Sequence, residues 1–180
     1  MELQSIKDRI PDYAKDLRLN LDAVLNRSSL TPAQANGAAL AAAFAAKSAP
    51  LVAALREGEL DPAQAQAALT AAALMGMNNV WYPYVEMAAD PELKSVRPEL
   101  RMNAYATHGG VDRTNFELYA LAASIVGKCE FCVQSHHKLL RENGFSTQQL
   151  RDVGRIAAAV NAVAQVLAAE HVESQELAAA

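Results

Sequence analysis

The chain carries the residue pattern of α-helices along almost its whole length, and this restricts its fold more than any other feature. Alanine, leucine, glutamine and glutamate dominate, and β-branched residues are sparse. No segment alternates apolar and polar residues over the length of a strand. The pattern therefore predicts an all-α, multihelical fold.

Signals for helix starts and stops divide the chain into segments. Thr31-Pro32 and Asp61-Pro62 each place an N-cap residue before a proline at the first helical position. Ser146 with Gln149, and Thr114 with Glu117, have the spacing of a capping box. Gly58, Gly109-Gly110 and Asn143-Gly144 mark stops. The ranges predicted to be helical are 12–26, 32–47, 49–57, 62–80, 97–106, 115–126, 129–142 and 147–170.

The short loops between these helices leave no room for a linker, so the 180 residues are predicted to form one domain, 1–180. Residues 71–81 resemble residues 121–132, with Gly76 matching Gly127, which suggests two helix-break-helix units and a possible internal duplication. Only the second unit has cysteines. The chemistry is therefore expected in the C-terminal half, within 114–142.

Charge and apolar patterning restrict the partners and the location of the chain. The net charge is −4 and there is no run of Lys or Arg, which argues against nucleic acid and against a polybasic membrane contact. Residues 1–16 carry charges throughout, and the longest apolar stretches, such as 39–46 and 118–127, are shorter than the roughly 20 residues of a membrane span. We expect a soluble protein of the cytoplasm that does not contact membranes.

The two cysteines of the chain, Cys129 and Cys132, lie three residues apart. A loop this short constrains the unfolded chain little, so a structural role for a disulfide is not favoured. In a reducing compartment the spacing points instead to a catalytic or metal-binding pair.

His136 is expected to assist this pair. On a helix, Cys132 and His136 are an i,i+4 pair, and His136 falls between the two cysteines in azimuth. Gly127 and Lys128 are expected to break the preceding helix, so that Cys129 starts a new one, where unpaired N–H groups favour a thiolate. His136 can accept the proton of Cys132, and one cysteine can then resolve the oxidised form of the other.

Two alternatives stand beside the redox interpretation. The cysteines can be small core residues without chemistry. Cys129, Cys132 and His136 can also be zinc ligands, with His108, His137 or Glu117 as the fourth. Against this, a structural zinc usually joins two separate segments, and these three ligands lie on one helix. A thioredoxin-like site is disfavoured because no βαβ pattern surrounds the motif.

Glu117 lies in the helix before the cysteines and has two possible roles. A carboxylate there can orient His136 or take its proton. It also completes the capping box with Thr114, which needs no chemistry. Taken alone, the residues favour the cap.

Blocks along nearly the whole chain are similar to the AhpD alkyl hydroperoxide reductase family, part of the carboxymuconolactone decarboxylase-like superfamily. The blocks are Tyr13-Ala14-Lys15-Asp16, Met75-Gly76-Met77-Asn78-Asn79-Val80, residues 97–103, Asn115-Phe116-Glu117-Leu118 and Cys129-x-x-Cys132-x-x-x-His136. The resemblance implies an all-helical, AhpD-like fold and a homo-oligomer, trimeric in relatives.

The same resemblance implies an antioxidant enzyme, an alkyl hydroperoxide reductase that binds no cofactor. Its redox-active disulfide would take electrons from dihydrolipoamide on the lipoylated acyltransferase of a 2-oxo acid dehydrogenase complex. It would pass them to a peroxiredoxin partner, or weakly to a hydroperoxide directly. Cys132 would form the sulfenic acid, Cys129 would donate a proton and resolve it, and His136 and Glu117 would relay protons. The superfamily also leaves open a non-redox, decarboxylase-like protein, which the cysteine pair disfavours.

The chain departs from some members of the family at Phe131, where they have a histidine assigned to the proton relay. The relay here is therefore expected to depend on Glu117 and His136. We expect direct peroxidase turnover to be weak, while disulfide exchange with partners is kept.

Overall fold

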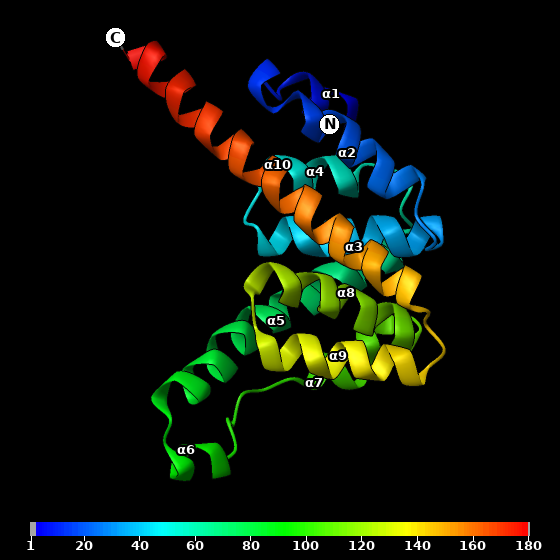
Figure 1. The fold of residues 1–180 in the computed structure, drawn as a ribbon, viewed down its shortest axis with the longest axis vertical. Coiled ribbons are helices and arrows are strands. Elements are labelled where there is room, and N and C mark those ends of the chain that lie inside the picture. The colour runs from blue at the N-terminus through cyan, green and yellow to red at the C-terminus, as the bar shows by residue number, and fades with distance from the viewer. Residues whose placement is uncertain (1–2, 180) are drawn as a thin grey trace.

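A computed structural model describes residues 3–179, with side chains up to residue 171, and shows helices joined by short loops (Figure 1). No strand occurs in the described part of the chain, so the predicted all-α class is confirmed. The elements are α1 (Leu3–Asp8), the 3-10 helix η1 (Asp12–Ala14), α2 (Lys15–Asn26), α3 (Pro32–Ala45), α4 (Ala49–Arg56), α5 (Pro62–Ala88), α6 (Pro91–Ser95), α7 (Asn103–Ala106), the 3-10 helix η2 (His108–Gly110), α8 (Arg113–Gly127), α9 (Glu130–Glu142) and α10 (Thr147–Ala179).

Helix α3 lies at the centre of the core and packs against α5, α8 and α10. Residues 38–43 of α3 are all fully buried, and five of these six positions are alanine, so neighbouring helices pack on all its faces at short distance. Gly37 extends this close packing. A Cβ atom there would lie 2.3 Å from the ring of Tyr119, which needs the space. The buried apolar residues of the helices form one continuous cluster.

Most of the expected helix starts are present. The Thr31 side chain accepts from the N–H of Gln34 at 3.2 Å, and the Gln34 side chain accepts from the N–H of Thr31 at 3.1 Å, which completes a capping box. Ser146 and Gln149 make the same reciprocal pair, at 3.1 and 2.9 Å. Asp61 caps α5 as expected. These local signals were sufficient because each cap involves only residues within three positions.

The capping box predicted at Thr114 and Glu117 is wrong. Asp112 is the N-cap of α8, and its Oδ1 accepts from the N–H of Thr114 at 2.8 Å. Asp112 is itself a favoured N-cap residue and lies two positions earlier, so it caps the helix first. Glu117 is left in the second turn of α8 and is fully buried.

Three predicted helix ranges also differ from the structure. Helix α5 does not end at residue 80 but continues through Pro83 to Ala88, although a proline cannot donate to the carbonyl four residues earlier. Of the predicted helix 97–106, only Asn103–Ala106 is helical. Arg97 precedes Pro98, which disfavours the helical conformation, and Glu99 has a positive φ of 51°. The sequence prediction also missed α1, and α10 extends beyond residue 170.

The two similar segments have different backbones. Helix α5 passes through residues 71–81 without a break, whereas α8 ends at Gly127 and the chain turns at Lys128. The first of the two expected helix-break-helix units is therefore absent, and an internal duplication stays a prediction.

Residues 147–171 of α10 are long and apolar enough to cross a membrane by length and composition alone. Half of its most apolar window is buried inside the protein, and the helix packs against α2, α3 and α8. Its apolar character is that of a helix that contributes to the core.

Candidate active site

The turn between α8 and α9 places both cysteines, and it has the predicted form. Lys128 adopts the left-handed conformation, with φ 55°, and the N–H of Cys129 donates to the carbonyl of Ser124 at 3.3 Å. Cys129 is the N-cap of α9, and its Sγ accepts from the N–H of Cys132 at 3.3 Å. Cys129 thus begins the new helix, as expected from Gly127 and Lys128.

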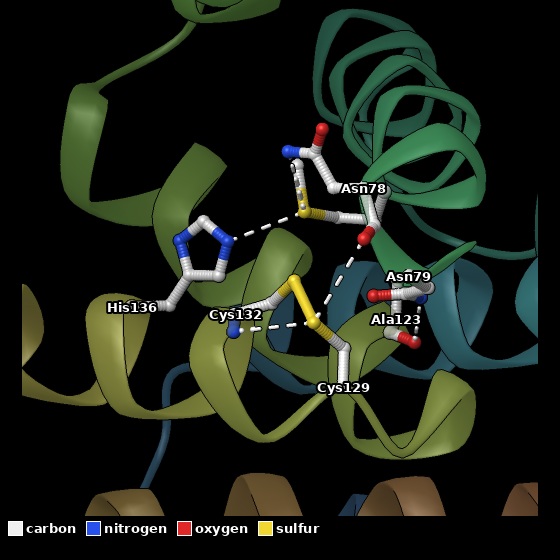
Figure 2. The surroundings of a disulfide bond; sticks show 7 residues. Asn78, Asn79, Ala123, Cys129, Cys132 and His136 are labelled. Atoms are coloured by element: carbon white, nitrogen blue, oxygen red, sulfur yellow. Dashed lines mark hydrogen bonds between the residues drawn. A yellow bond between two sulfur atoms is a disulfide. The ribbon is translucent and has the colours of Figure 1, made fainter. Parts of the chain in front are cut away.

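Cys129 and Cys132 form a disulfide (Figure 2). The two sulfurs are in different surroundings. Cys129 is fully buried, whereas Cys132 lines a pocket of about 340 Å³ that opens to the surface. A reagent entering the pocket therefore meets Cys132.

His136 lies one turn beyond Cys132 on α9 and lines the same pocket. Its Nδ1 lies 2.6 Å from Oε2 of Glu117. An ionised carboxylate can only accept, so Nδ1 carries a proton and donates it to Glu117. Nε2 is then the nitrogen that gains and loses the second proton. Nε2 faces Sδ of Met75 at 3.2 Å, and a thioether is a weak acceptor that competes little for that proton.

Glu117 has three partners although its side chain is fully buried. Its carboxylate accepts from His136 and from the phenol of Tyr105, and Nε of Arg113 lies 4.0 Å away. Burial alone would raise the pKa of Glu117, but the hydrogen bonds from His136 and Tyr105 outweigh it and hold that pKa below its ordinary value. Glu117 is therefore ionised at neutral pH and oriented toward His136.

Tyr105, on α7, is a site residue that the sequence did not indicate. Its phenol donates to Glu117 while its ring lines the pocket and packs edge-on against Phe116. Burial, and then the bond to Glu117, raise the pKa of Tyr105 far above its usual range, so the phenol keeps its proton. The two partners are twelve positions apart, with the loop before α8 between them, and no local pattern predicts such a contact.

The rest of the pocket is largely apolar and aromatic. Phe131 is half exposed at its edge and stacks on Tyr82, with 4.2 Å between ring centroids. The lining residues are Asn78, Tyr82, Met102, Tyr105, Ala106, Phe131, Cys132, Ser135 and His136. Met75 is fully buried and also contacts His136.

The described residues do not bring together a set of zinc ligands. Among the described residues, no group of three or more His, Cys, Asp or Glu side chains is arranged to hold a metal ion. The sulfurs bond to one another, and Nδ1 of His136 is engaged by Glu117. His108 lies instead against the ring of Phe116.

Comparisons with known proteins agree with this arrangement. Residues 91–172, which include the disulfide and His136, match the carboxymuconolactone decarboxylase family. The chain is 45% identical over 173 residues to the alkyl hydroperoxide reductase AhpD of Rhodospirillum centenum, covering 94% of this chain and 92% of the relative. It is 41% identical over 170 residues to the protein of that name from Gluconacetobacter diazotrophicus, covering 93% of each. It is 42% identical over 170 residues to that of Coxiella burnetii, covering 91% and 96%.

These relatives match almost from end to end, and the matched region contains the whole cysteine–histidine–glutamate arrangement. The chain therefore belongs to the AhpD alkyl hydroperoxide reductase family.

Proposed function

We propose that this protein is a dithiol/disulfide oxidoreductase that reduces alkyl hydroperoxides with electrons from dihydrolipoamide. One observation carries the proposal. The disulfide has one sulfur, that of Cys132, in a pocket also lined by His136, and Nδ1 of His136 is held by the buried carboxylate of Glu117. The names of the relatives supply the peroxide substrate.

The residues have distinct roles in the cycle. In the reduced protein His136 takes the proton of Cys132, and Glu117 stabilises the imidazolium. The Cys132 thiolate attacks the terminal peroxide oxygen, giving Cys132 sulfenic acid and an alkoxide that leaves as the alcohol after protonation by His136. The Cys129 thiol then attacks the sulfenic sulfur, and the disulfide forms with release of water. Dihydrolipoamide reduces the disulfide through a mixed disulfide and becomes lipoamide.

The lining of the pocket favours binding of an organic hydroperoxide and not only of hydrogen peroxide. Its walls are formed largely by the rings of Tyr82 and Phe131 and the side chains of Met102 and Ala106, which offer apolar surface to an alkyl chain. Burial of that chain would favour alkyl substrates through their apolar area.

Partners and assembly extend the proposal. A peroxiredoxin and the lipoylated acyltransferase of a 2-oxo acid dehydrogenase complex are the proposed redox partners, as the family resemblance implies, in the cytoplasm. A homo-oligomer is supported by large apolar side chains that are exposed on the projecting second half of α5 and the segment after it (Figure 1), and the family resemblance implies that it is a trimer. They are Val80, Tyr84, Met87, Val96 and Leu100. Light scattering of the purified protein tests the trimer.

The decisive experiment separates this proposal from a non-redox decarboxylase-like protein. The reduced protein is mixed in a stopped-flow instrument with cumene hydroperoxide, with dihydrolipoamide as reductant. We expect two thiols per chain to be lost with one equivalent of hydroperoxide and steady turnover with both substrates. Retained turnover in Cys132→Ser, or no thiol loss in the wild type, would refute the proposal.

A further inference from the structure

Two asparagines, Asn78 and Asn79, follow one another on α5, but their side-chain amides have different surroundings. Nδ2 of Asn79 donates to the carbonyl oxygen of Ala123 at 3.2 Å. Gly127 leaves room for that side chain, since a Cβ atom at Gly127 would lie 2.1 Å from Nδ2 of Asn79. Asn79 therefore joins α5 to α8, whereas the side chain of Asn78 lines the pocket beside Cys132 and His136.

The Asn78 amide has little to bond in the pocket. Its Nδ2 lies 4.0 Å from Sδ of Met75, a long contact, and a thioether is a weak acceptor. Among the described residues this is the single hydrogen-bond contact of the side chain. An amide has two N–H donors and one carbonyl acceptor, so most of its hydrogen-bonding capacity is left for a molecule that enters the pocket.

Asn78 and His136 reach the pocket from different helices and approach the same atom. Nε2 of His136 lies 3.2 Å from Sδ of Met75, the sulfur that Nδ2 of Asn78 also contacts. Both nitrogens are therefore held near one point, at the pocket that Cys132 lines as well. Figure 2 shows the Asn78 amide across from Cys132, with the imidazole of His136 to one side. A molecule bound against Cys132 thus faces both the amide and the imidazole.

Attack by the Cys132 thiolate places negative charge on the leaving oxygen of a hydroperoxide. The thiolate bonds to the terminal oxygen, the O–O bond breaks, and its electron pair goes to the oxygen that carries the alkyl group. Because displacement at oxygen is in line, the leaving oxygen lies beyond the attacked oxygen, on the side of the pocket away from Cys132. A preorganised N–H at the place where negative charge develops lowers the barrier.

We propose that the Asn78 side chain donates an N–H hydrogen bond to the leaving oxygen of the hydroperoxide, and so stabilises the developing alkoxide until His136 protonates it. Asn78 gives up no proton, because the amide is a neutral donor and the proton of the alcohol comes from His136. This inference rests on the proposed function and adds a catalytic residue to it. The hydrogen bond should assist most the substrates whose leaving oxygen is most basic, as in alkyl hydroperoxides.

The test compares two oxidants of similar size that differ in their leaving group. Cumene hydroperoxide releases a basic alkoxide, whereas perbenzoic acid releases benzoate, which spreads the charge over two oxygens. Asn78→Leu, of similar size and without polar atoms, should slow thiol loss from the reduced protein about 30-fold with cumene hydroperoxide, the effect of one hydrogen bond to a charged group. With perbenzoic acid the rate should fall by no more than about threefold. Rapid-quench, single-turnover measurements give both rates without a reductant.

Two controls separate this role from a general disturbance of the protein. Asn115→Leu is the matched variant, because the half-buried Asn115 amide also joins helices, through Gln34 and Gln64, and none of these residues lines the pocket. It should leave both rates unchanged. Alkylation of Cys132 by iodoacetamide forms no alkoxide, so it should be equally fast in the wild type and in the Asn78→Leu variant.

The possible outcomes decide between the two levels of the proposal. An unchanged rate with cumene hydroperoxide in Asn78→Leu, or an equal loss with both oxidants, would overturn this inference alone. A wild type that loses no thiols to cumene hydroperoxide would overturn the proposed function and this inference together. Asn78→Ala replaces the leucine variant if that variant does not fold, with the same expected rates.

Discussion

Two carboxylates, Glu117 and Asp152, are buried at different places in the protein, and their partners differ in kind. Glu117 is bonded to a histidine and a tyrosine in the pocket. Asp152, on α10, accepts from the backbone N–H and hydroxyl of Ser29, each at 2.8 Å. It also accepts from Arg155 at 3.0 Å and Arg151 at 3.2 Å.

Both carboxylates stay ionised, but only Glu117 faces a histidine. Burial would raise the pKa of Asp152, and the hydrogen bonds from Ser29 and the two arginines outweigh it and lower that pKa well below its usual range. None of those donors changes its protonation at neutral pH. Asp152 therefore joins the loop before α3 to α10, whereas Glu117 orients His136 in the pocket.

The largest expected effect is at Glu117. Glu117→Gln keeps the shape but removes the charge that stabilises the His136 imidazolium, so kcat/KM with cumene hydroperoxide should fall about 100-fold. The free energy of unfolding, measured in urea, should change by only about 1 kcal/mol. A variant that unfolds more readily but keeps its rate would make Glu117 a structural residue like Asp152.

The converse is expected at Asp152. Asp152→Ala leaves the donors of Ser29 unpaired and should lower the free energy of unfolding by about 2 to 3 kcal/mol, with little change in peroxidase rate below the unfolding temperature. Because the pKa of Asp152 is lowered on folding, its contribution is present above its ordinary value of 3.8 and is lost as the pH falls further. The stability difference between variant and wild type should therefore shrink in urea titrations below about pH 4. A difference independent of pH would contradict this role.

Tyr105→Phe removes the hydrogen bond from the pocket residue Tyr105 to Glu117 and should reduce kcat/KM about tenfold. It removes one of the hydrogen bonds that lower the pKa of Glu117, so that pKa should rise. The acidic limb of the pH–rate profile should accordingly move to higher pH. Tyr82→Phe, which alters another pocket tyrosine, is the control and should leave the profile in place.

The smallest effect is expected at Phe131. Phe131→His adds a titratable group at the pocket edge and should raise the peroxidase rate a few-fold. Loss of the stack on Tyr82 should cost about 1 kcal/mol of stability at most, since Phe131 is half exposed. Unchanged rates with both hydroperoxide and dihydrolipoamide would show that the relay does not extend to this position.

The sequence was most informative where partners are near one another along the chain. The capping boxes at Thr31 and Ser146, and the start of α9 at Cys129, each depend on contacts within three residues. The spacing from Cys129 to His136 predicted that one helix begins at Cys129 and carries Cys132 and His136, and the structure has this arrangement.

Features that depend on distant segments could not be predicted in the same way. Glu117 had two local interpretations, and contacts with Tyr105 and His136 from other helices decide between them. Pro83 was expected to lie beyond the end of a helix, yet α5 continues through it. Met75 and Asn79 reach the site from α5 only because that helix packs beside α8 and α9.

The contact between His136 and Met75 means that the protein handles oxidants next to a third oxidisable sulfur, besides those of Cys129 and Cys132. Conversion of the Met75 thioether to a sulfoxide would introduce a polar oxygen where the imidazole now packs. Met75 is fully shielded from solvent, while Cys132 is open to the pocket. An incoming peroxide therefore meets Cys132 before Met75, and we expect the burial of Met75 to protect its thioether over many turnovers.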